Sequence, residues 1–497
     1  MEREEWVFYA LITALLALAA YIYLFDSGPD VDPFVLTVQS SVSQMRLPHE
    51  TAVYRSRVVP HGARGLLTGL AIGGGSGGRM GPTRDGTIED LWALALKAKI
   101  STFSFGQLES ISPQQLSSAV ESLGGLISRN SANTVVVALP NSAESLICLF
   151  AGALHGVQVV FAPMNDELDK YVRFCKATVV VTTGELAELL IQNTNVGTIV
   201  FTGKRQLQGP HLVPWDHAIS NPKQAGDALK KAIDPPMAMV YSSGEKIVLT
   251  TVSNQNIVSA VASQLKALPI KEQWNNKDTV VSCTTELSNH TIVHNVAALA
   301  VGAHLVLPES TSSVNLFLLV STIKPTILVT DDETSLSLAA RSERLKALHL
   351  VQLQIALNTL RLGKLPTHSY IIRDFASVRL VHSGALQDEP ALSDKDANLI
   401  RALTGARLIH SLYVPLCLSP IAQTNIYDYR AGEPGVINFG APMACLELKL
   451  KDHGLYQASE RKGQIWIQGP AVTEEPQWVN TGLIALFGPD GALKIHS

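Results

Sequence analysis

The sequence predicts an α/β protein in which two doubly wound α/β lobes are followed by a small β subdomain and preceded by one N-terminal transmembrane helix. Three observations lead to this prediction. Short Val-rich runs alternate with helix-length segments, short β-like pieces joined by Gly and Pro begin at about residue 428, and a 20-residue run near the N-terminus carries no charge. The 497 residues also fit about three domains of about 150 residues each.

The uncharged run covers residues 6–25, from Trp6 to Phe25, and has about the length that crosses a hydrocarbon core of roughly 30 Å as a helix. Trp and Tyr residues lie near its ends, as they do at membrane interfaces. The alternatives are a cleaved signal peptide and a buried core helix. Acidic residues precede the run, whereas a signal peptide starts with basic residues and has a shorter apolar stretch. We therefore expect residues 1–27 to be a retained single-pass membrane anchor.

The charges that flank this run set its orientation weakly, with a small preference for a cytosolic body. A glycosylated sequon at residues 289–291 would instead place the body in a lumen. The cysteines are odd in number and scattered without C-x-x-C spacing, so they favour a reducing compartment and predict neither a disulfide framework nor a zinc site. They are Cys148, Cys175, Cys283, Cys417 and Cys445. We expect a cytosolic body on the endoplasmic reticulum membrane.

The composition excludes two classes of protein. Hydrophobic residues make up 46% of the chain and charged residues 16%, which excludes wholesale disorder. Thirty-nine Lys and Arg against 43 Asp and Glu leave a net charge of −4, so the chain has no basic excess that would bind a nucleic-acid backbone. We expect no nucleic-acid partner.

Residues 28–86 are predicted to form an irregular tether that contains the Gly-rich stretch 73–78. A Gly-rich run can cradle a phosphate, but this one lacks the Gly-Lys-Ser/Thr ending and the strand-to-helix setting of a phosphate-binding loop. A flexible connection is the preferred interpretation.

Residues 87–235 are predicted to form the first α/β lobe and residues 236–427 the second. In the first lobe, Val-rich runs bounded by turn residues recur about every 22 residues, at 134–139, 157–162, 178–182 and 198–202. In the second lobe they lie at 237–241, 279–282, 304–307, 326–329 and 378–382. Such runs, separated by helices, indicate parallel strands in βαβ units. Residues 428–497 are predicted to form the β subdomain.

Seven short strings then occur in a fixed order. They are TIEDLW at 87–92, LPNSAE at 139–144, GAL at 152–154, KPT at 324–326, SGA at 383–385, GAP at 440–442 and GQIWIQGP at 463–470. In this order they resemble the adenylate-forming superfamily (AMP-binding, acyl-CoA synthetase-like), and the layout is closest to membrane-anchored long-chain acyl-CoA synthetases. The resemblance implies enzymes that join a carboxylate to ATP, release pyrophosphate and pass the acyl group to a thiol.

In that superfamily, Tyr-Thr-Ser-Gly-Ser/Thr-Thr-Gly, followed by a Lys, surrounds the β- and γ-phosphates. Residues 241–248 read YSSGEKIV, which keeps only the first half of the string. The resemblance assigns four of them to a degenerate nucleotide site: Ser242, Ser243, Gly244 and Lys246. Glu245 places a carboxylate beside the phosphates, and like charges at a partly buried site repel by several kcal/mol. We interpret residues 242–245 as an ordinary turn, with residual phosphate binding aided by Lys246 as the alternative.

Two further positions of the resemblance lack the required chemistry. Pro415 and Leu416 stand where the superfamily has the Thr and Glu of Tyr-Gly-x-Thr-Glu, whose Glu holds magnesium. Leu483 replaces the acid of Thr-Gly-Asp, so a buried ribose hydroxyl would lose its partner at a cost of about 1–3 kcal/mol. Thr481 is retained and completes the degenerate nucleotide site. We expect no metal and no cofactor; ATP or AMP and Mg would bind only if this site works.

The resemblance places an acyl pocket between the lobes. Its substrate-binding residues would be Ser383, Gly384, His410, Leu412 and Val414. Leu412, Val414 and Leu416 make this wall more apolar, so the cleft either holds an acyl chain or is packed solid. His410 lies beside apolar residues, and we interpret it as a structural residue rather than a metal ligand.

The chain ends where the superfamily's mobile C-terminal subdomain, with its catalytic lysine, would begin. We therefore expect this subdomain to be absent and assign no catalytic residue. The leading hypothesis is a membrane-anchored acyl-CoA synthetase-like protein that has lost its ligase chemistry and binds a lipid, an acyl chain or a partner protein. The alternative is an active long-chain fatty acid–CoA ligase (AMP-forming), with its missing subdomain on another chain. A third hypothesis is a scaffold within a membrane complex.

Overall fold

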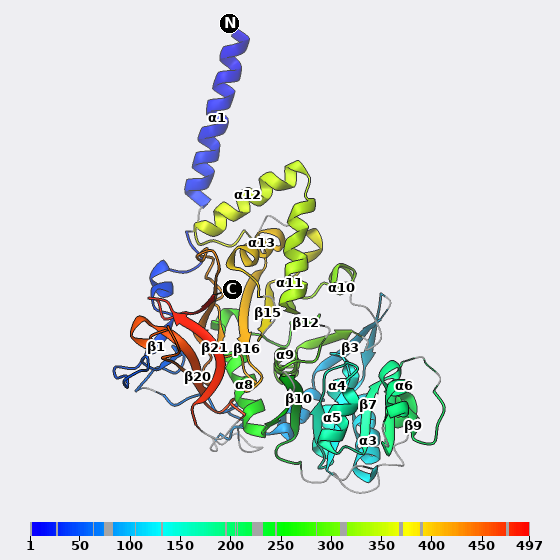
Figure 1. Ribbon diagram of the computed structural model, residues 1–497. Coiled ribbons are helices and arrows are strands. Elements are labelled where there is room, and N and C mark those ends of the chain that lie inside the picture. Colours follow the sequence, from blue (N-terminus) through cyan, green and yellow to red (C-terminus); the bar gives the residue numbers. More distant parts are fainter. Residues whose placement is uncertain are drawn as a thin grey trace.

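The computed structural model describes residues 2–25, 28–62, 64–73, 83–104, 106–130, 133–193, 196–203, 205, 207–220, 232–243, 246–284, 286–308, 316–366, 371–387, 391–473 and 477–496. Their strands form two sheets with helices packed on and between them (Figure 1). The predicted α/β class is confirmed. The glycines of the predicted tether from Gly74 to Gly78 lie outside the described residues.

The first sheet has the strand order β11-β10-β6-β5-β7-β8-β9. The Val-rich runs of the first predicted lobe are its central parallel strands, which confirms the βαβ pattern. Its strands are β5 (Thr134–Ala138), β6 (Gln158–Phe161), β7 (Val179–Thr183), β8 (Thr198–Thr202), β9 (Leu212–Pro214), β10 (Met237–Ser243) and β11 (Lys246–Val252). Its helices are α3 (Pro113–Asn130), α4 (Ala143–Leu154), α5 (Leu168–Cys175), α6 (Gly184–Asn193) and α7 (Trp215–Ile219).

The second sheet is larger and mixed, with the order β1-β2-β19-β20-β21-β22-β18-β17-β16-β15-β14-β12-β13-β3-β4. Its α/β part contains β3 (Lys99–Ser104), β4 (Gln107–Ile111), β12 (Thr279–Ser282), β13 (His304–Pro308), β14 (Ile327–Asp331), β15 (Leu380–Leu386) and β16 (Arg407–Tyr413). Its helices are α2 (Ile88–Ala95), α8 (Asn254–Lys266), α9 (Asn289–Ala300), α10 (Leu316–Ile323), α11 (Asp332–Ala339), α12 (Ala347–Arg361) and α13 (Asp394–Thr404).

The β subdomain continues this second sheet without a break, because β17 joins β16 to β18 by antiparallel pairing. Its strands are β1 (Ser40–Val42), β2 (Tyr54–Ser56), β17 (Ala422–Gln423), β18 (Val436–Pro442), β19 (Glu447–Lys451), β20 (Lys462–Gln468), β21 (Val479–Phe487) and β22 (Leu493–His496). A bulge in β18 lies next to Gly440, whose positive φ of 71° and close approach to Gln423 leave no room for a side chain.

The expected boundary between the lobes at residues 235 and 236 is crossed in both directions. Strands β10 and β11 follow it in sequence but join the first sheet, where β10 pairs with β6. Strands β3 and β4 precede it but join the second sheet, where β3 pairs with β13. Each sheet therefore contains strands from the other half of the chain.

A helical layer lies between the two sheets. Helix α8 packs against α9 and α2, and α2 packs against α4. Each of α4, α8 and α9 begins with a serine N-cap in a capping box, formed by Ser142, Ser253 and Ser288. The side chains of this layer and the facing strands of both sheets form one continuous buried cluster. The core therefore spans both lobes.

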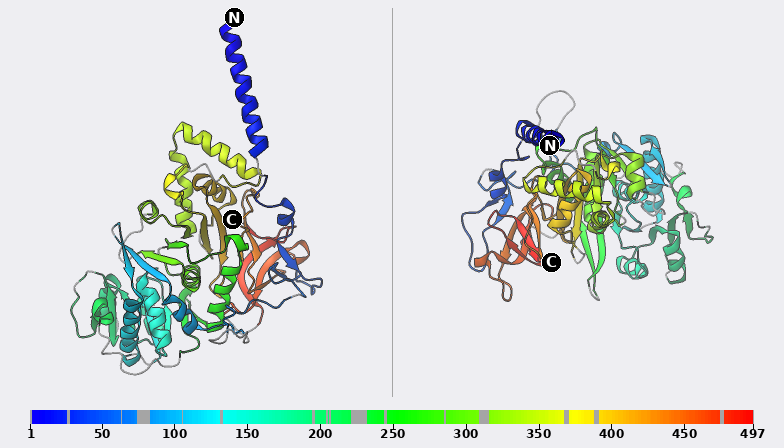
Figure 2. Two further views of the ribbon diagram at one scale, coloured as in Figure 1. Left: turned by 180° about the vertical axis from the view of Figure 1, so that it is seen from behind. Right: turned by 90° about the horizontal axis from the view of Figure 1, so that it is seen from above.

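Helix α1 (Glu2–Phe25) precedes the body and extends away from it (Figures 1 and 2). It covers the run of residues 6–25. In the part of the chain that the structure describes, no helix meets the length and apolarity needed to cross a membrane.

The segment predicted as an irregular tether contains regular structure. A 3₁₀ turn at Pro33–Thr37 is followed by β1 and β2, which pair with each other and with β19 at the edge of the second sheet. Residues 40–56 are therefore attached to the β subdomain through β1 and β2. Sequence periodicity missed these strands because each has only three residues.

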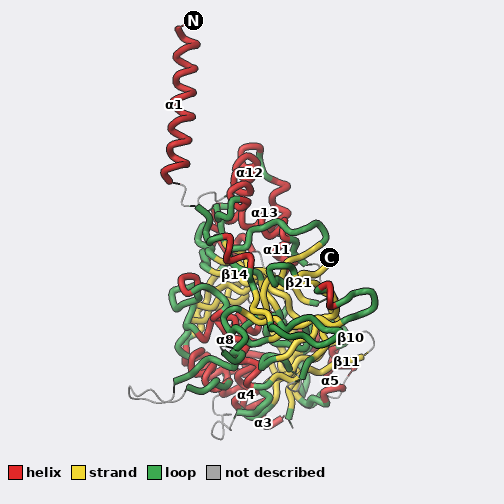
Figure 3. Tube along the Cα trace, turned by 90° about the vertical axis from the view of Figure 1, so that its left-hand side faces the viewer, coloured by secondary structure: helices red, strands yellow, loops and turns green. Residues whose placement is uncertain are grey.

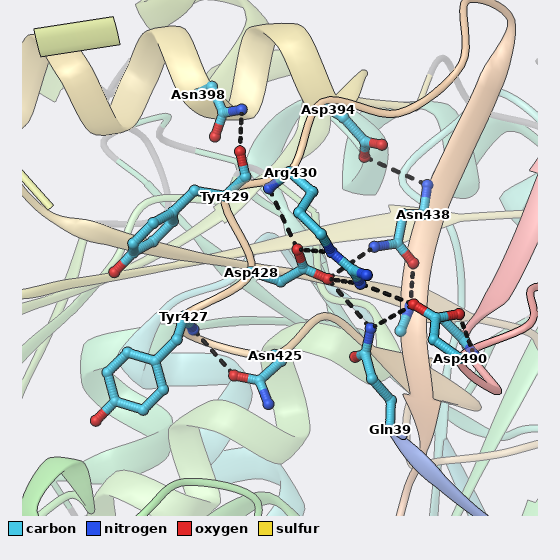
Figure 4. A network of polar contacts seen from close by, with 12 residues as sticks. Gln39, Asp394, Asn398, Asn425, Tyr427, Asp428, Tyr429, Arg430, Asn438 and Asp490 are labelled. Carbon is cyan, nitrogen blue, oxygen red and sulfur yellow. Dashed lines mark hydrogen bonds and ion pairs between the residues drawn. The ribbon is translucent and has the colours of Figure 1, made fainter. Parts of the chain in front are cut away.

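A polar network fixes this segment to the body (Figure 4). Arg430 donates to Asp428 at 2.6 Å and to Asp490 at 2.7 Å, and Gln39 Nε2 donates to both carboxylates at 3.1 Å. The two carboxylate side chains are almost fully buried, with 2% and 9% exposed. Burial alone would raise the pKa of Asp490, but the hydrogen bond and charge of Arg430 hold it below its ordinary value.

This network predicts the effect of Arg430→Gln. We expect the variant to lose about 2–3 kcal/mol of unfolding free energy at pH 7, less than the about 3–5 kcal/mol of a fully buried pair, because half of the Arg430 side chain is exposed. In the wild type, the stabilisation from Asp490 is present above its unfolded pKa of about 3.9 and is lost as pH falls through the lower folded pKa.

In the variant, protonation of a carboxylate removes the repulsion, so the deficit should shrink as pH falls from 7 to about 4. Urea unfolding at several pH values measures it. Arg46→Gln, at an exposed arginine, is the control and should change stability by less than about 0.5 kcal/mol. A deficit that is independent of pH would contradict this account.

Candidate functional site

A cavity of about 560 Å³ lies where strands of both sheets end. Its wall is formed by residues at or after the ends of β5, β6, β10, β15 and β16, together with the start of α9. This is the place where α/β folds bind ligands. Its apolar lining includes Val137, Leu139, Phe161, Met164, Met239, Leu287, Leu386, Val414 and Leu416. The cleft that the sequence left as either open or packed solid therefore contains a cavity.

The segment expected to surround phosphates forms a β-hairpin. Strands β10 and β11 pair antiparallel up to Ser243 opposite Lys246, so only two residues connect them. Those two, Gly244 and Glu245, and the Ser243 side chain lie outside what the structure describes. The interpretation of residues 242–245 as an ordinary turn therefore stays a prediction.

The remaining residues of the degenerate nucleotide site lie apart. The Ser242 hydroxyl lines the cavity, is 2.9 Å from the Tyr171 hydroxyl and donates to Glu167 at 3.3 Å. Lys246 is exposed on β11 and does not line the cavity. Thr481 lines the cavity, but its hydroxyl donates to the Ile465 carbonyl at 3.1 Å and accepts from the Leu483 N–H at 3.2 Å.

Two of the predicted substrate-binding residues hold a buried carboxylate behind the cavity wall. Asp332 accepts hydrogen bonds from Ser383 Oγ at 2.7 Å and from the Leu392 N–H at 2.8 Å, and its other contact is His410 Nε2 at 2.8 Å. The side chains of Asp332 and His410 are 0% and 2% exposed. Burial alone would raise the pKa of Asp332, but His410 and these donors hold it below its ordinary value. The interpretation of His410 as a structural residue agrees with this geometry.

The other predicted substrate-binding residues differ in position. Gly384 packs against a ring, because a Cβ built on it would lie 2.5 Å from His290 Cγ. Leu412 is buried and does not line the cavity, whereas Val414 does. Of the five predicted residues, Val414 alone faces the cavity among those that the structure describes.

Sequence reasoning missed two unpaired polar atoms buried in the cavity wall. Tyr413 and Asn289 line the cavity and are 0% and 7% exposed, and neither Tyr413 Oη nor Asn289 Oδ1 has a hydrogen-bond partner within the described chain. Burial, and secondarily nearby Cys417 and Cys445, raise the pKa of Tyr413 well above its ordinary value, so its hydroxyl stays a donor. Both atoms have almost no accessible surface, so neither is presented to the cavity space. The sequence signal that could have pointed to these two residues was their position, Tyr413 at the end of a strand and Asn289 at the start of a helix.

Asn289 also belongs to the sequon. Its amide Nδ2 is buried and donates to the carbonyls of Val414 at 3.3 Å and Cys417 at 2.9 Å. The side chain is therefore not accessible for glycosylation in the folded chain.

A magnesium site would need oxygen ligands in the cavity. Pro415 and Leu416 line the wall and offer no side-chain ligand, and Glu286 at the exposed rim is the lining carboxylate. Among the described residues, no group of three or more His, Cys, Asp or Glu side chains could hold a metal ion. Glu286 is therefore the carboxylate that the described cavity wall offers to a magnesium ion.

Comparison with known proteins places this chain in a family. Residues 93–475 match the AMP-binding enzyme family. The chain belongs to the AMP-binding enzyme family. This confirms the superfamily that the order of short strings indicated, because the match covers more than three quarters of the chain.

Individual relatives of this AMP-binding protein are distant. A putative uncharacterized protein of Saccharomyces cerevisiae, YHR045W, is 22% identical over 556 aligned residues, which cover 96% of this chain and 95% of the yeast protein. The anthranilate CoA ligase AuaEII, solved with anthranoyl-AMP, has a TM-score of 0.62 at 16% identity, covering 83% of this chain and 77% of its own.

A benzoate CoA ligase from Burkholderia xenovorans LB400 has a TM-score of 0.60 at 14% identity and covers 82% of this chain and 79% of its own. At these identities the two solved ligases establish a shared fold and no more.

The Asp332 contacts predict a large loss of stability when this residue, which does not line the cavity, is replaced. Asp332→Ala would leave His410 and the Leu392 N–H buried without their partner, and we expect it to lower the unfolding free energy by about 3–5 kcal/mol. Glu333→Ala removes an exposed carboxylate next to it and should cost less than about 0.5 kcal/mol. Equal stability of the two variants in urea titrations would show that the buried pair contributes nothing.

Proposed function

We propose that this protein is a membrane-tethered, catalytically degenerate member of the AMP-binding enzyme family that binds an acyl chain or a similar apolar ligand between its lobes. The cavity of about 560 Å³ carries this proposal. Its size lies within the about 300–1,000 Å³ of ligand pockets, which are lined mainly by apolar side chains and a few polar groups.

The lining supports a ligand that is mainly apolar. An acyl chain would lie along the aliphatic wall at Val414 and Leu416.

The loss of ligase chemistry is supported by three features of the chain. Only two residues connect β10 and β11, so few backbone N–H groups can turn toward a phosphate. Pro415 and Leu416 offer no metal ligand. Leu483 provides no acceptor for ribose hydroxyls.

The membrane tether rests on the sequence of residues 6–25, a run without a charge, and not on the structure, in whose described part no helix is long and apolar enough to cross a membrane. We place the body in the cytosol and the tether in the endoplasmic reticulum membrane. The five free cysteines suit a reducing compartment.

The ligand proposal predicts a lipid that co-purifies with the chain. Native mass spectrometry of the full chain in mild detergent should detect one apolar molecule per protein. Leu416→Trp fills part of the cavity, so the ligand and the new side chain compete for the same space. Overpacking of about 1–3 kcal/mol would weaken the affinity for the ligand about 5- to 150-fold. Leu455→Trp, at a side chain that is 97% exposed, is the control and should retain the ligand. A wild-type protein free of lipid, and unresponsive to added fatty acid or fatty alcohol, would contradict the proposal.

The loss of ligase chemistry predicts no fatty-acid-dependent exchange of pyrophosphate into ATP at any chain length. It also predicts that calorimetric titration with ATP and magnesium gives no dissociation constant below about 100 μM, which is about 5.5 kcal/mol of binding. An established acyl-CoA ligase run in parallel controls the assay. Exchange above background would support the alternative, an active long-chain fatty acid–CoA ligase.

A further inference from the structure

Helix α12 presents a row of large aliphatic side chains to the surface. It packs on the body through Leu353, Ala356 and Leu360, which are buried. Four other side chains are 70%, 59%, 60% and 74% exposed, in the order Leu348, Val351, Ile355 and Leu362. Their spacing of three, four and seven residues places them along one side of the helix. We call these four residues the α12 stripe.

Single exposed aliphatic residues are ordinary on protein surfaces, whereas contiguous apolar patches mark contacts with a partner or a membrane. The exposed polar residues Gln354 and Asn358 border the stripe, with Asn358 one turn from both Ile355 and Leu362, and Leu350 is 48% exposed on another side of the helix. The four large side chains of the stripe still lie in one row, and nothing in the described chain covers them.

The charges of the segment that carries the stripe favour an anionic partner, with the Asp30 carboxylate as a further acidic group at the end of α12. Between residues 340 and 366 the chain has five basic residues and one acidic residue, Glu343, which gives a formal charge of +4 with His349 neutral. The basic residues are Arg341, Arg344, Lys346, Arg361 and Lys364. They flank both ends of the helix. An apolar stripe bordered by Lys and Arg is the pattern of helices that lie in the interface of an anionic bilayer.

The position of α12 agrees with that partner. The chain that leaves α1 is fixed to the end of α12, because the Asp30 N–H donates to the Gly363 carbonyl at 2.9 Å and the Leu365 N–H donates to Asp30 Oδ2 at 3.2 Å. Tyr429 also donates to Asp30 Oδ2, at 2.8 Å. Figures 1 and 3 show α12 at the end of the body from which α1 extends. A membrane that holds α1 would therefore lie next to the α12 stripe.

We propose that α12 is an interfacial helix that lies on an anionic lipid surface, with the α12 stripe among the acyl chains and the flanking basic residues on the lipid phosphates. This inference rests on the proposed membrane attachment and adds a second contact to it. The bilayer would then lie against the body as well as around the tether, which limits how the cavity is oriented toward the membrane.

An environment-sensitive nitrobenzoxadiazole label tests the contact in the full chain. Cys175, the half-buried cysteine, is replaced by Ser so that the label reacts only at Ile355→Cys in the stripe or at Ile191→Cys in the control. Ile191 is 49% exposed on α6, at the other end of the body (Figure 1). With vesicles of phosphatidylcholine and phosphatidylserine, the emission at position 355 should rise and shift to shorter wavelength, and that at position 191 should stay unchanged.

Flotation of the same samples separates this inference from the tether. Protein that floats with vesicles but gives the same emission at both positions retains the tether and overturns the interfacial helix. Protein that does not float overturns both. A change at position 355 that needs no vesicles and grows with protein concentration would show that a second copy covers the stripe, which also overturns the proposal.

A separate experiment tests the contribution of the basic residues. In the Ile355→Cys background, Arg344→Gln with Lys346→Gln should lower the ratio of immersed to free helix by about fivefold for each charge removed, on vesicles that contain phosphatidylserine. On phosphatidylcholine alone, the double variant and its parent should respond equally. An equal response on both lipid mixtures would remove the basic residues from the proposal. Circular dichroism of each labelled variant verifies that the fold is retained.

Discussion

The burial of one continuous apolar layer between the two sheets is the constraint on which the rest of the structure depends. Helices α2, α4, α8 and α9 fill this layer, and its buried cluster takes side chains from both sheets. The β10–β11 and β3–β4 pairs each complete the sheet of the other half. Neither sheet can assemble fully without strands from both halves, so the two lobes form one folding unit rather than two domains joined by a linker.

The same arrangement separates scaffold from chemistry. Strand ends from both sheets meet around one cavity, and the residues that line it belong mainly to the segments that follow those strands. In such segments Leu416 can stand where relatives have a carboxylate, and a short β10–β11 turn can replace a longer loop. The buried layer keeps its packing in both cases. Ser383 and His410 illustrate the opposite case, since both keep the framework together by holding Asp332.

Nine strands of the two lobes could be predicted because their apolar runs are buried on both faces, and each begins within two residues of its predicted start. Strands β3, β4, β9 and β11 were not predicted. The sheet that each strand joins could not be predicted, because hydrophobic periodicity carries no information about which strands pair. In the site, the loss of acids at Leu416 and Leu483 is visible in the sequence. The unpaired atoms of Tyr413 and Asn289 are not, because an unmet hydrogen bond is a property of the folded surroundings.

The strand pairing of the N-terminal segment also determines how the molecule bears force. A pull on α1 reaches the body first at Asp30, whose contacts with Gly363, Leu365 and Tyr429 join three distant parts of the chain. Beyond that point, load passes to the β1–β2–β19 ladder and to Gln39 and Ser40, which are bonded to Asp490 and Gly491. A force on the body is therefore distributed over many hydrogen bonds, and the N-terminal segment transmits it as a structured, attached part of the fold rather than as a flexible linker.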